Sequence, residues 1–236
     1  MAIISFSLLI TGVSADEMNF SVNTVIPNNQ IDREKTYFNL KMAPKQEQDV
    51  TVTLKNNIKK DITIEIGVNT AKTNTNGVVE YSESNIKKDS SLRYDISKVV
   101  TGPGSVVIPA SSSKDVTFHI FMPDNAFNGI LLGGLTFQQK SSEILQSKAS
   151  GTSVTNEYQY AVAMLLKEND TVVQPNLNLI QVKPDQLNSR NVITAEIQND
   201  QAVLLSKVSV DAKIYSKGGK KPVYTSIKHD MQIAPN

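Results

Sequence analysis

The sequence has no cysteine and no tryptophan, and it contains only two histidines. Without cysteine the chain can form no disulfide bond, thiol nucleophile or thiolate metal site, so its fold depends on its hydrophobic cores. Neither His119 nor His229 has a second histidine at the spacing of a metal site. We therefore predict no metal site, no cofactor and no catalytic residue.

The chain also lacks a strong net charge. Its 24 Lys and Arg residues nearly balance 23 Asp and Glu residues, which gives a formal charge of +1. Basic residues occur as pairs such as Lys59–Lys60 and Lys87–Lys88, which are typical of solvated turns. No long-range field attracts nucleic acid, so we predict no nucleic-acid partner.

Catalytic motifs are missing as well. The glycine-rich run from Gly129 to Gly134 lacks the Lys-Ser/Thr ending of a phosphate-binding loop, and it predicts a strand with a bulge or a close backbone approach instead. No Gly-x-Ser-x-Gly sequence occurs. Acidic residues are numerous, but a sequence does not show whether two carboxylates flank one glycosidic bond. We predict that the protein is not an enzyme.

Residues 1–15 form an uncharged, apolar stretch that ends where the first acidic residues begin. Val13 and Ala15 are small residues at the positions that a signal peptidase requires. The apolar run is about 12 residues long, too short to cross a bilayer as a helix. No basic residue precedes it, which indicates that Met1 lies inside a longer signal peptide. We predict export, with a buried N-terminal strand as the alternative.

From Phe20 onward, apolar and polar residues alternate in short runs separated by turn-forming Asn, Gly and Pro. Val50, Val52 and Leu54, for example, alternate with threonines. A period of two is typical of antiparallel sheets with one solvated face. The sequence therefore predicts an all-β fold of two tandem Ig-like β-sandwich domains, with one short helical turn within residues 84–98.

Residues 138–153 are poor in apolar side chains and predict a loop or linker. We accordingly expect a first domain at 16–140, a linker at 141–153 and a second domain at 154–236. The apolar segment 158–168 has the composition of a buried strand, which either opens the second domain or returns to complete the first.

Five blocks of the mature chain resemble, in the same order, motifs of the WxL-interacting protein family, surface proteins of Gram-positive bacteria. They are FSVNTVIPNNQIDREKTYFNLKMAPKQEQDVTVTLKNN (20–57), NTAKTNTNGVVEYS (69–82), MPDNAFNGILLGGLTF (122–137), QPNLNLIQVKPDQLNSRNVITAEIQN (174–199) and MQIAPN (231–236). The resemblance implies an N-terminal peptidoglycan-binding domain and a C-terminal host-binding domain. It also implies WxL-domain surface proteins and host extracellular-matrix proteins as partners, at the cell wall.

Family members continue beyond the motif that ends at Asn236, with further strands and a membrane anchor. The resemblance therefore implies that the second domain is truncated here and that an anchor belongs only to a full-length form. An interrupted sandwich leaves an unpaired edge strand, and such an edge recruits other strands. We expect poor solubility or strand-mediated association.

Sugar binding depends on exposed aromatic faces with amide groups nearby. Tyr81, Tyr94 and Phe127 lie near Asn residues in expected loops, so we predict them as ligand-binding residues. The alternative is that each anchors its loop by packing on the end of the sandwich. The predicted function is binding and scaffolding at the cell surface; a protein-only assembly module and a wall-modifying hydrolase are its alternatives.

Overall fold

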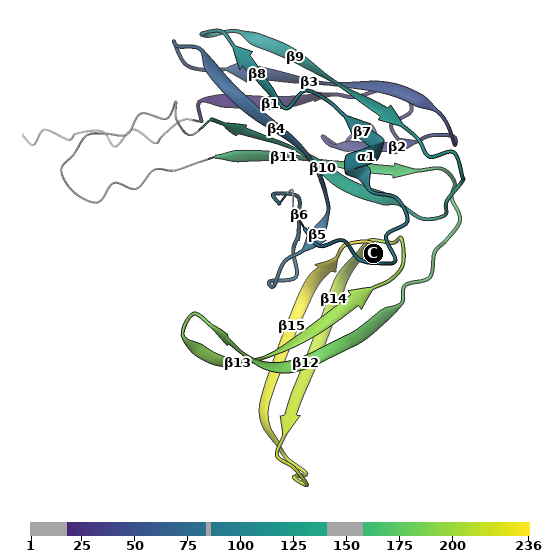
Figure 1. Cartoon of the computed structure of the whole chain (residues 1–236), viewed down its shortest axis with the longest axis vertical. Coiled ribbons are helices and arrows are strands. Elements are labelled where there is room, and N and C mark those ends of the chain that lie inside the picture. Colours follow the sequence, from purple (N-terminus) through teal and green to yellow (C-terminus); the bar gives the residue numbers. More distant parts are fainter. Residues whose placement is uncertain (1–17, 84–85, 141–157) are drawn as a thin grey trace, which may run out of the picture.

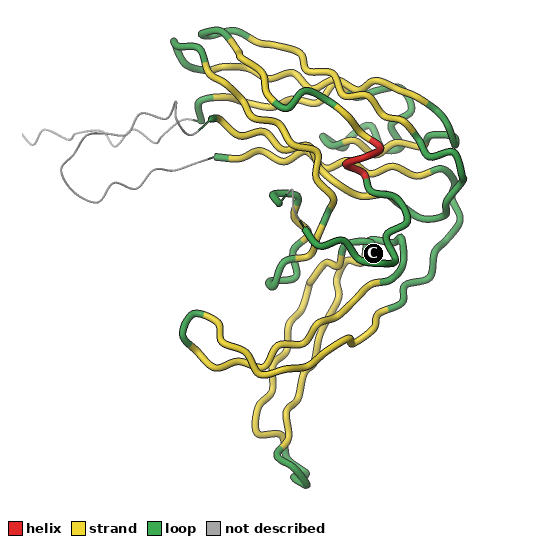
Figure 2. The backbone as a smooth tube through the Cα atoms, in the orientation of Figure 1, coloured by secondary structure: helices red, strands yellow, loops and turns green. Residues whose placement is uncertain are grey.

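The computed structural model describes residues 18–83, 86–140 and 158–236 (Figures 1 and 2). The predicted signal peptide and linker lie outside these residues. The predicted all-β fold is confirmed, and α1 (Ile96–Val99) supplies a single helical turn in the described chain. No helix in these ranges has the length and apolarity needed to cross a membrane.

Residues of the first two thirds of the chain form a two-layer sandwich (Figure 1). One sheet has the order β1 (Phe20–Val25), β3 (Glu47–Asn56), β9 (Ser113–Phe121), β7 (Val100–Thr101). The other has the order β2 (Phe38–Lys41), β11 (Gln159–Lys167), β10 (Leu131–Gln139), β4 (Ile62–Thr70), β8 (Ser105–Ile108). All neighbours are antiparallel except β2 and β11.

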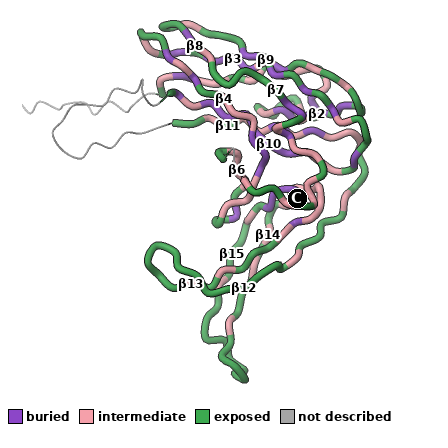
Figure 3. Tube along the Cα trace, in the orientation of Figure 1, coloured by how far each residue is buried: buried purple, intermediate pink, exposed green. Residues whose placement is uncertain are grey.

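The apolar side chains of the alternating pattern in the sequence fill the space between the two sheets. Val50 and Val52 of β3 and Phe118 of β9 are buried, while the residues between them face solvent (Figure 3). Phe118 meets Phe137 of β10 edge to face, with ring centroids 6.1 Å apart. Each such side chain contributes about 1.5–3 kcal/mol by leaving water, so this core is the main source of stability.

Strand β11 belongs to the larger sheet of this sandwich. It pairs with β10 along its length and with β2 at its end, and it buries Met164 and Leu166. Of the two interpretations of segment 158–168, the structure has the one in which the chain returns to complete the first sandwich. A stable N-terminal half therefore requires residues on both sides of the expected linker.

The C-terminal half consists of two hairpins, each a separate two-stranded sheet. They are β12 (Leu177–Leu187) with β13 (Arg190–Asn199), and β14 (Leu205–Tyr215) with β15 (Pro222–Ile233). Many of their apolar side chains stay exposed, including Ile193 at 52% and Leu179 at 65%. A small hairpin of the sandwich, β5 (Lys72–Thr73) with β6 (Val79–Glu80), extends toward them (Figure 1).

The side chain of Asn56, at the end of β3, joins the two layers of the sandwich. It is fully buried, and its Nδ2 donates to the carbonyl oxygens of Lys60, Ile108 and Pro109 at 2.8–3.1 Å. Its Oδ1 accepts from the backbone N–H of Ile58 at 3.0 Å. One amide thus satisfies backbone groups of the turn after β3 and of the end of β8.

Replacement of Asn56 by Ala should destabilise the protein by about 3 kcal/mol, because it leaves buried backbone groups without partners. Urea unfolding followed by far-UV circular dichroism measures the loss. The matched control is Asn57→Ala, since the Asn57 side chain only donates to the Met18 carbonyl at the surface; we expect a change within about 0.5 kcal/mol. Equal losses in the two variants would contradict this role of Asn56.

Candidate functional site

The two halves of the chain meet at the glycine-rich run before and within β10. Gly129 has φ +88°, and a Cβ there would lie 2.2 Å from the carbonyl oxygen of Ala202. The next residue, Ile130, donates its N–H to the same oxygen at 2.8 Å. As expected from the sequence, this run marks a close backbone approach, and its partner is the turn between the C-terminal hairpins.

The end of the described chain completes this junction. Gln232 donates its N–H to the Gly77 carbonyl at 2.7 Å, and Ala234 donates its N–H to Thr73 Oγ1 at 2.8 Å. Asn236 Nδ2 donates to the carbonyl of Ser91, also at 2.8 Å. Three of the family-like blocks, at 69–82, 122–137 and 231–236, therefore meet in one place.

Tyr81 lies in a small second core at this junction. Its ring packs on Gly134, where a Cβ would come within 2.6 Å of the ring, and beside a buried cluster that includes Leu132 and Ala234. Burial raises the pKa of Tyr81 above its ordinary value. This packing is that of a loop anchor, and Tyr81 does not line the cavity described below.

Gly129→Ala should loosen the junction, because the new methyl group collides with a backbone oxygen and the backbone conformation disfavours side chains. We expect a loss of about 1–3 kcal/mol and faster proteolysis within the C-terminal half. Thermal unfolding and limited proteolysis measure both. Gly104→Ala is the control, since a Cβ at Gly104 has nothing within 4 Å; a similar loss in both variants would argue against the close approach.

The side-chain carboxylate of Asp89 also links the N-terminal and C-terminal halves of the chain. Both oxygens of Asp89 accept from Gln198 Nε2 of β13, at 2.8 and 2.9 Å. The backbone N–H of Ser91 is the main cause that holds the pKa of Asp89 below its ordinary 3.8, followed by the Ser91 hydroxyl and Gln198. The stabilisation by this carboxylate is therefore present above pH 3.8 and is lost as the pH falls through the lowered pKa.

In an NMR titration, the side-chain amide signal of Gln198 should shift with a midpoint below pH 3.8, and Asp89→Asn should abolish that transition. A midpoint at or above 3.8 would mean that the contact does not favour the ionised carboxyl group.

A cavity of about 380 Å³ opens at the junction, where the predicted residues Tyr94 and Phe127 come together. Their ring centroids are 5.7 Å apart, and the Arg93 guanidinium lies 5.1 Å from the centre of the Tyr94 ring. The Tyr94 hydroxyl donates to the Asn125 carbonyl at 3.0 Å, which fixes the ring. Two of the three predicted ligand-binding residues thus form one aromatic wall, with Phe127 largely buried and Tyr94 more accessible.

Polar groups from distant segments line the rest of the cavity: Asn128, Asp200, Gln201 and Asn236. Asp200 accepts from the side-chain amides of Gln201, Asn176 and Asn178, which keep its pKa below the ordinary value. It therefore remains ionised at neutral pH. These residues were not predicted from the sequence, because nothing in their local sequence indicates that they line the same cavity as Tyr94.

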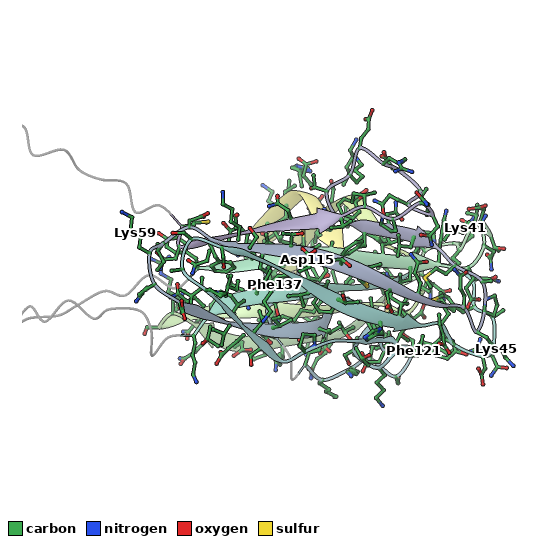
Figure 4. The ribbon with its side chains drawn as sticks, turned by 90° about the horizontal axis from the view of Figure 1, so that it is seen from above. Lys41, Lys45, Lys59, Asp115, Phe121 and Phe137 are labelled. Carbon is green, nitrogen blue, oxygen red and sulfur yellow. The ribbon has the colours of Figure 1, made fainter. Side chains whose placement is uncertain are left out.

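A second polar surface is the outer face of the four-stranded sheet (Figure 4). Here the polar groups bind one another: Thr53 Oγ1 donates to Asp115 at 2.6 Å, and Asp49 meets His119 across β3 and β9 at 2.5 Å. Phe121, 47% exposed, is an isolated aromatic ring at one end of the face. The cavity combines two aromatic rings with several side-chain amides, so it is the better candidate ligand site.

No three His, Asp or Glu side chains gather at metal-binding distance within residues 18–83, 86–140 and 158–236. Two aromatic rings, several side-chain amides, the Arg93 guanidinium and the Asp200 carboxylate surround a space of small-ligand size.

Two family models match the chain. Residues 20–139 match "WxL Interacting Protein, peptidoglycan binding domain" and residues 149–236 match "WxL Interacting Protein, host binding domain". The chain therefore belongs to the WxL-interacting protein family, which confirms the resemblance of its motifs. Both models describe binding domains, and the second begins before β11, a strand that lies in the first sandwich.

No curated protein sequence matches the chain. Some solved structures match the chain at low similarity. The PapD-like domain 7 of human CEP192 is 10% identical with a TM-score of 0.39, covering 72% of this chain and 99% of that one. The Pseudomonas aeruginosa CupB2 chaperone is 8% identical with a TM-score of 0.38, covering 82% and 79%.

Proposed function

We propose that this chain is a non-catalytic binding protein of the Gram-positive cell surface that attaches to peptidoglycan through its N-terminal sandwich. The observation that carries the proposal is the cavity at the junction of the halves, whose aromatic wall of Tyr94 and Phe127 comes from the part of the chain that matches a peptidoglycan binding domain. Peptidoglycan lies outside the membrane, so this function requires the export that residues 1–15 predict.

The chemistry of the cavity fits this ligand. Peptidoglycan consists of N-acetylated amino sugars that carry short peptides. The apolar face of a sugar ring would pack on the Tyr94 ring, and the acetamido group would pair with the side-chain amides of Asn128 and Gln201. Arg93 would bind a carboxylate of the peptide. A single short contact of this kind is weak, and many copies along the wall would give firm retention.

The C-terminal half would engage a second protein, either a WxL-domain surface protein or a host matrix protein. Its match to a host binding domain and its exposed apolar strands support this role.

Retention of the full chain on purified peptidoglycan tests the proposal; the full chain is needed because β11 completes the first sandwich. Arg93→Ala should weaken retention about fivefold or more, because it removes the cation without touching the sandwich core. Phe121→Ala, on the outer sheet face, is the matched control and should bind like the unchanged protein.

Loss of binding in the Phe121 variant with full binding in the Arg93 variant would move the site to the sheet face. Failure of the unchanged chain to bind would favour the protein-only assembly module. Release of soluble wall fragments would instead indicate a hydrolase.

A further inference from the structure

The backbone of Phe127, one of the two aromatic residues of the cavity wall, is held by the residues that follow β11. Glu168 Oε2 accepts from the Phe127 N–H at 2.8 Å, and Asn169 Nδ2 donates to the Phe127 carbonyl oxygen at 3.0 Å. Asn169 Oδ1 accepts from the backbone N–H of Thr171 at 3.0 Å. Because a carbonyl only accepts and an N–H only donates, these backbone groups allow the Asn169 amide a single orientation.

The orientation of Asn169 in turn sets that of Asn128, which lines the cavity. Asn169 Nδ2 also donates to Asn128 at 3.1 Å, so the atom of Asn128 that it meets is the oxygen, Oδ1. Asn169 itself does not line the cavity. Asn128 therefore turns its oxygen toward Asn169 and leaves Nδ2, which has no partner in the part of the chain that the structure describes, as a donor for the cavity.

A carboxylate fixes the second amide, in the other half of the chain. Asp200 Oδ2 accepts from Asn176 at 2.8 Å and from Asn178 at 2.9 Å, and Asp200 Oδ1 accepts from Gln201 Nε2 at 2.7 Å. An ionised carboxylate has no proton to donate, so only the nitrogen of the Gln201 amide can face it. Gln201 Oε1 is left without a partner among residues 18–83, 86–140 and 158–236, and it serves the cavity as an acceptor.

The donor and the acceptor lie on the two sides of one backbone contact. Asn128 precedes Gly129 and Gln201 precedes Ala202, and a Cβ on Gly129 would lie 2.2 Å from the Ala202 carbonyl oxygen. Ile130 donates its N–H to that same oxygen at 2.8 Å. Asn128 and Gln201 are therefore neighbours across the junction of the two halves.

We propose that these two amides select an N-acyl group, so that the cavity distinguishes N-acetylated amino sugars from the same sugars with a free amino group. The carbonyl oxygen of the acyl group accepts from Asn128 Nδ2, and its N–H donates to Gln201 Oε1. Asn169 and Asp200 are positioning residues, because each holds one of the two amides in the required orientation. The proposal rests on the peptidoglycan binding proposed above and names the group of that ligand on which recognition depends.

A free amino group does not replace the acyl group. At neutral pH it is an ammonium group, which has donors and no acceptor, so it leaves Asn128 Nδ2 without a partner. It also brings a second positive charge into a cavity that the Arg93 guanidinium lines. The Asp200 carboxylate offers such a group little, because its two oxygens already accept from three amides. Deacetylated sugars therefore bind more weakly.

The test measures retention of the full chain on purified peptidoglycan and on the same material after enzymatic removal of its N-acetyl groups. Two hydrogen bonds distinguish the two materials, so retention should be about five- to tenfold weaker after deacetylation. Equal retention on both would overturn the inference and leave the proposed function intact. Retention on neither would mean that the proposed function itself fails, and the inference with it.

Asn128→Asp separates recognition of the acyl group from a general effect of wall charge. The new side chain has the same shape and still accepts from Asn169, but it carries an acceptor in place of the Asn128 donor. The preference should disappear or reverse, with deacetylated wall retained at least as well as acetylated wall. Asn23→Asp is the matched control, since Asn23 is exposed on β1 and does not line the cavity; it should keep the full preference. A full preference in the Asn128 variant would overturn the inference.

Asn169→Ala tests the positioning role without changing the lining of the cavity. Loss of the Asn169 amide frees the Asn128 side chain to turn over, so the preference for acetylated wall should fall to about twofold or less. The measured quantity is the ratio of the two retentions, because a general loss of stability lowers both retentions alike. A ratio that stays at about five- to tenfold would overturn the positioning role of Asn169.

Discussion

The structure depends on a buried side-chain amide at the end of a strand. In the sandwich, Asn56 binds backbone groups of the turn that leaves β3 and of the end of β8, which lies in the opposite sheet. An apolar residue could fill the same space but would leave these groups without partners in a dry interior, at a cost of about 1–3 kcal/mol each. The amide therefore fixes how the two layers start to pack, and the same device recurs at Asn199.

The two halves differ in how much of their apolar surface is buried. The first half is a sandwich with a closed core. In the described residues of the second half the strands form separate hairpins, and many of their apolar side chains are exposed. The proposed ligand cavity lies where the two halves meet.

Much of the fold could be predicted from the sequence, because a period of two leaves little choice for strands such as β3 and β9. The family motifs could also be recognised in the sequence, because each is one uninterrupted stretch of residues. The position of β11 stayed open, because a buried strand has the same composition in either domain. The likeness between Asn56 and Asn199 could not be predicted, because the segments that follow them share almost no side chains and the likeness lies in hydrogen bonds from each asparagine side chain to the backbone.

Only part of the candidate site could be predicted from the sequence. Tyr94 and Phe127 could be chosen as aromatic residues in loops beside asparagines. Asp200 and Gln201 lie in the other half of the chain and join the same cavity only because the two halves pack together. Tyr81 met the same criteria and packs on Gly134 instead, a contact about fifty residues away in the chain that no local pattern encodes.

The central claim is that a buried asparagine side chain at the end of a strand organises the adjoining turn, at Asn56 and again at Asn199. Residue-specific amide hydrogen exchange tests it most directly. The account predicts strong protection of the Ile58 and Gln201 amides, which donate to the two asparagine side chains, and loss of that protection at Ile58 in Asn56→Ala and at Gln201 in Asn199→Ala. Fast exchange of both amides in the unchanged protein would contradict it.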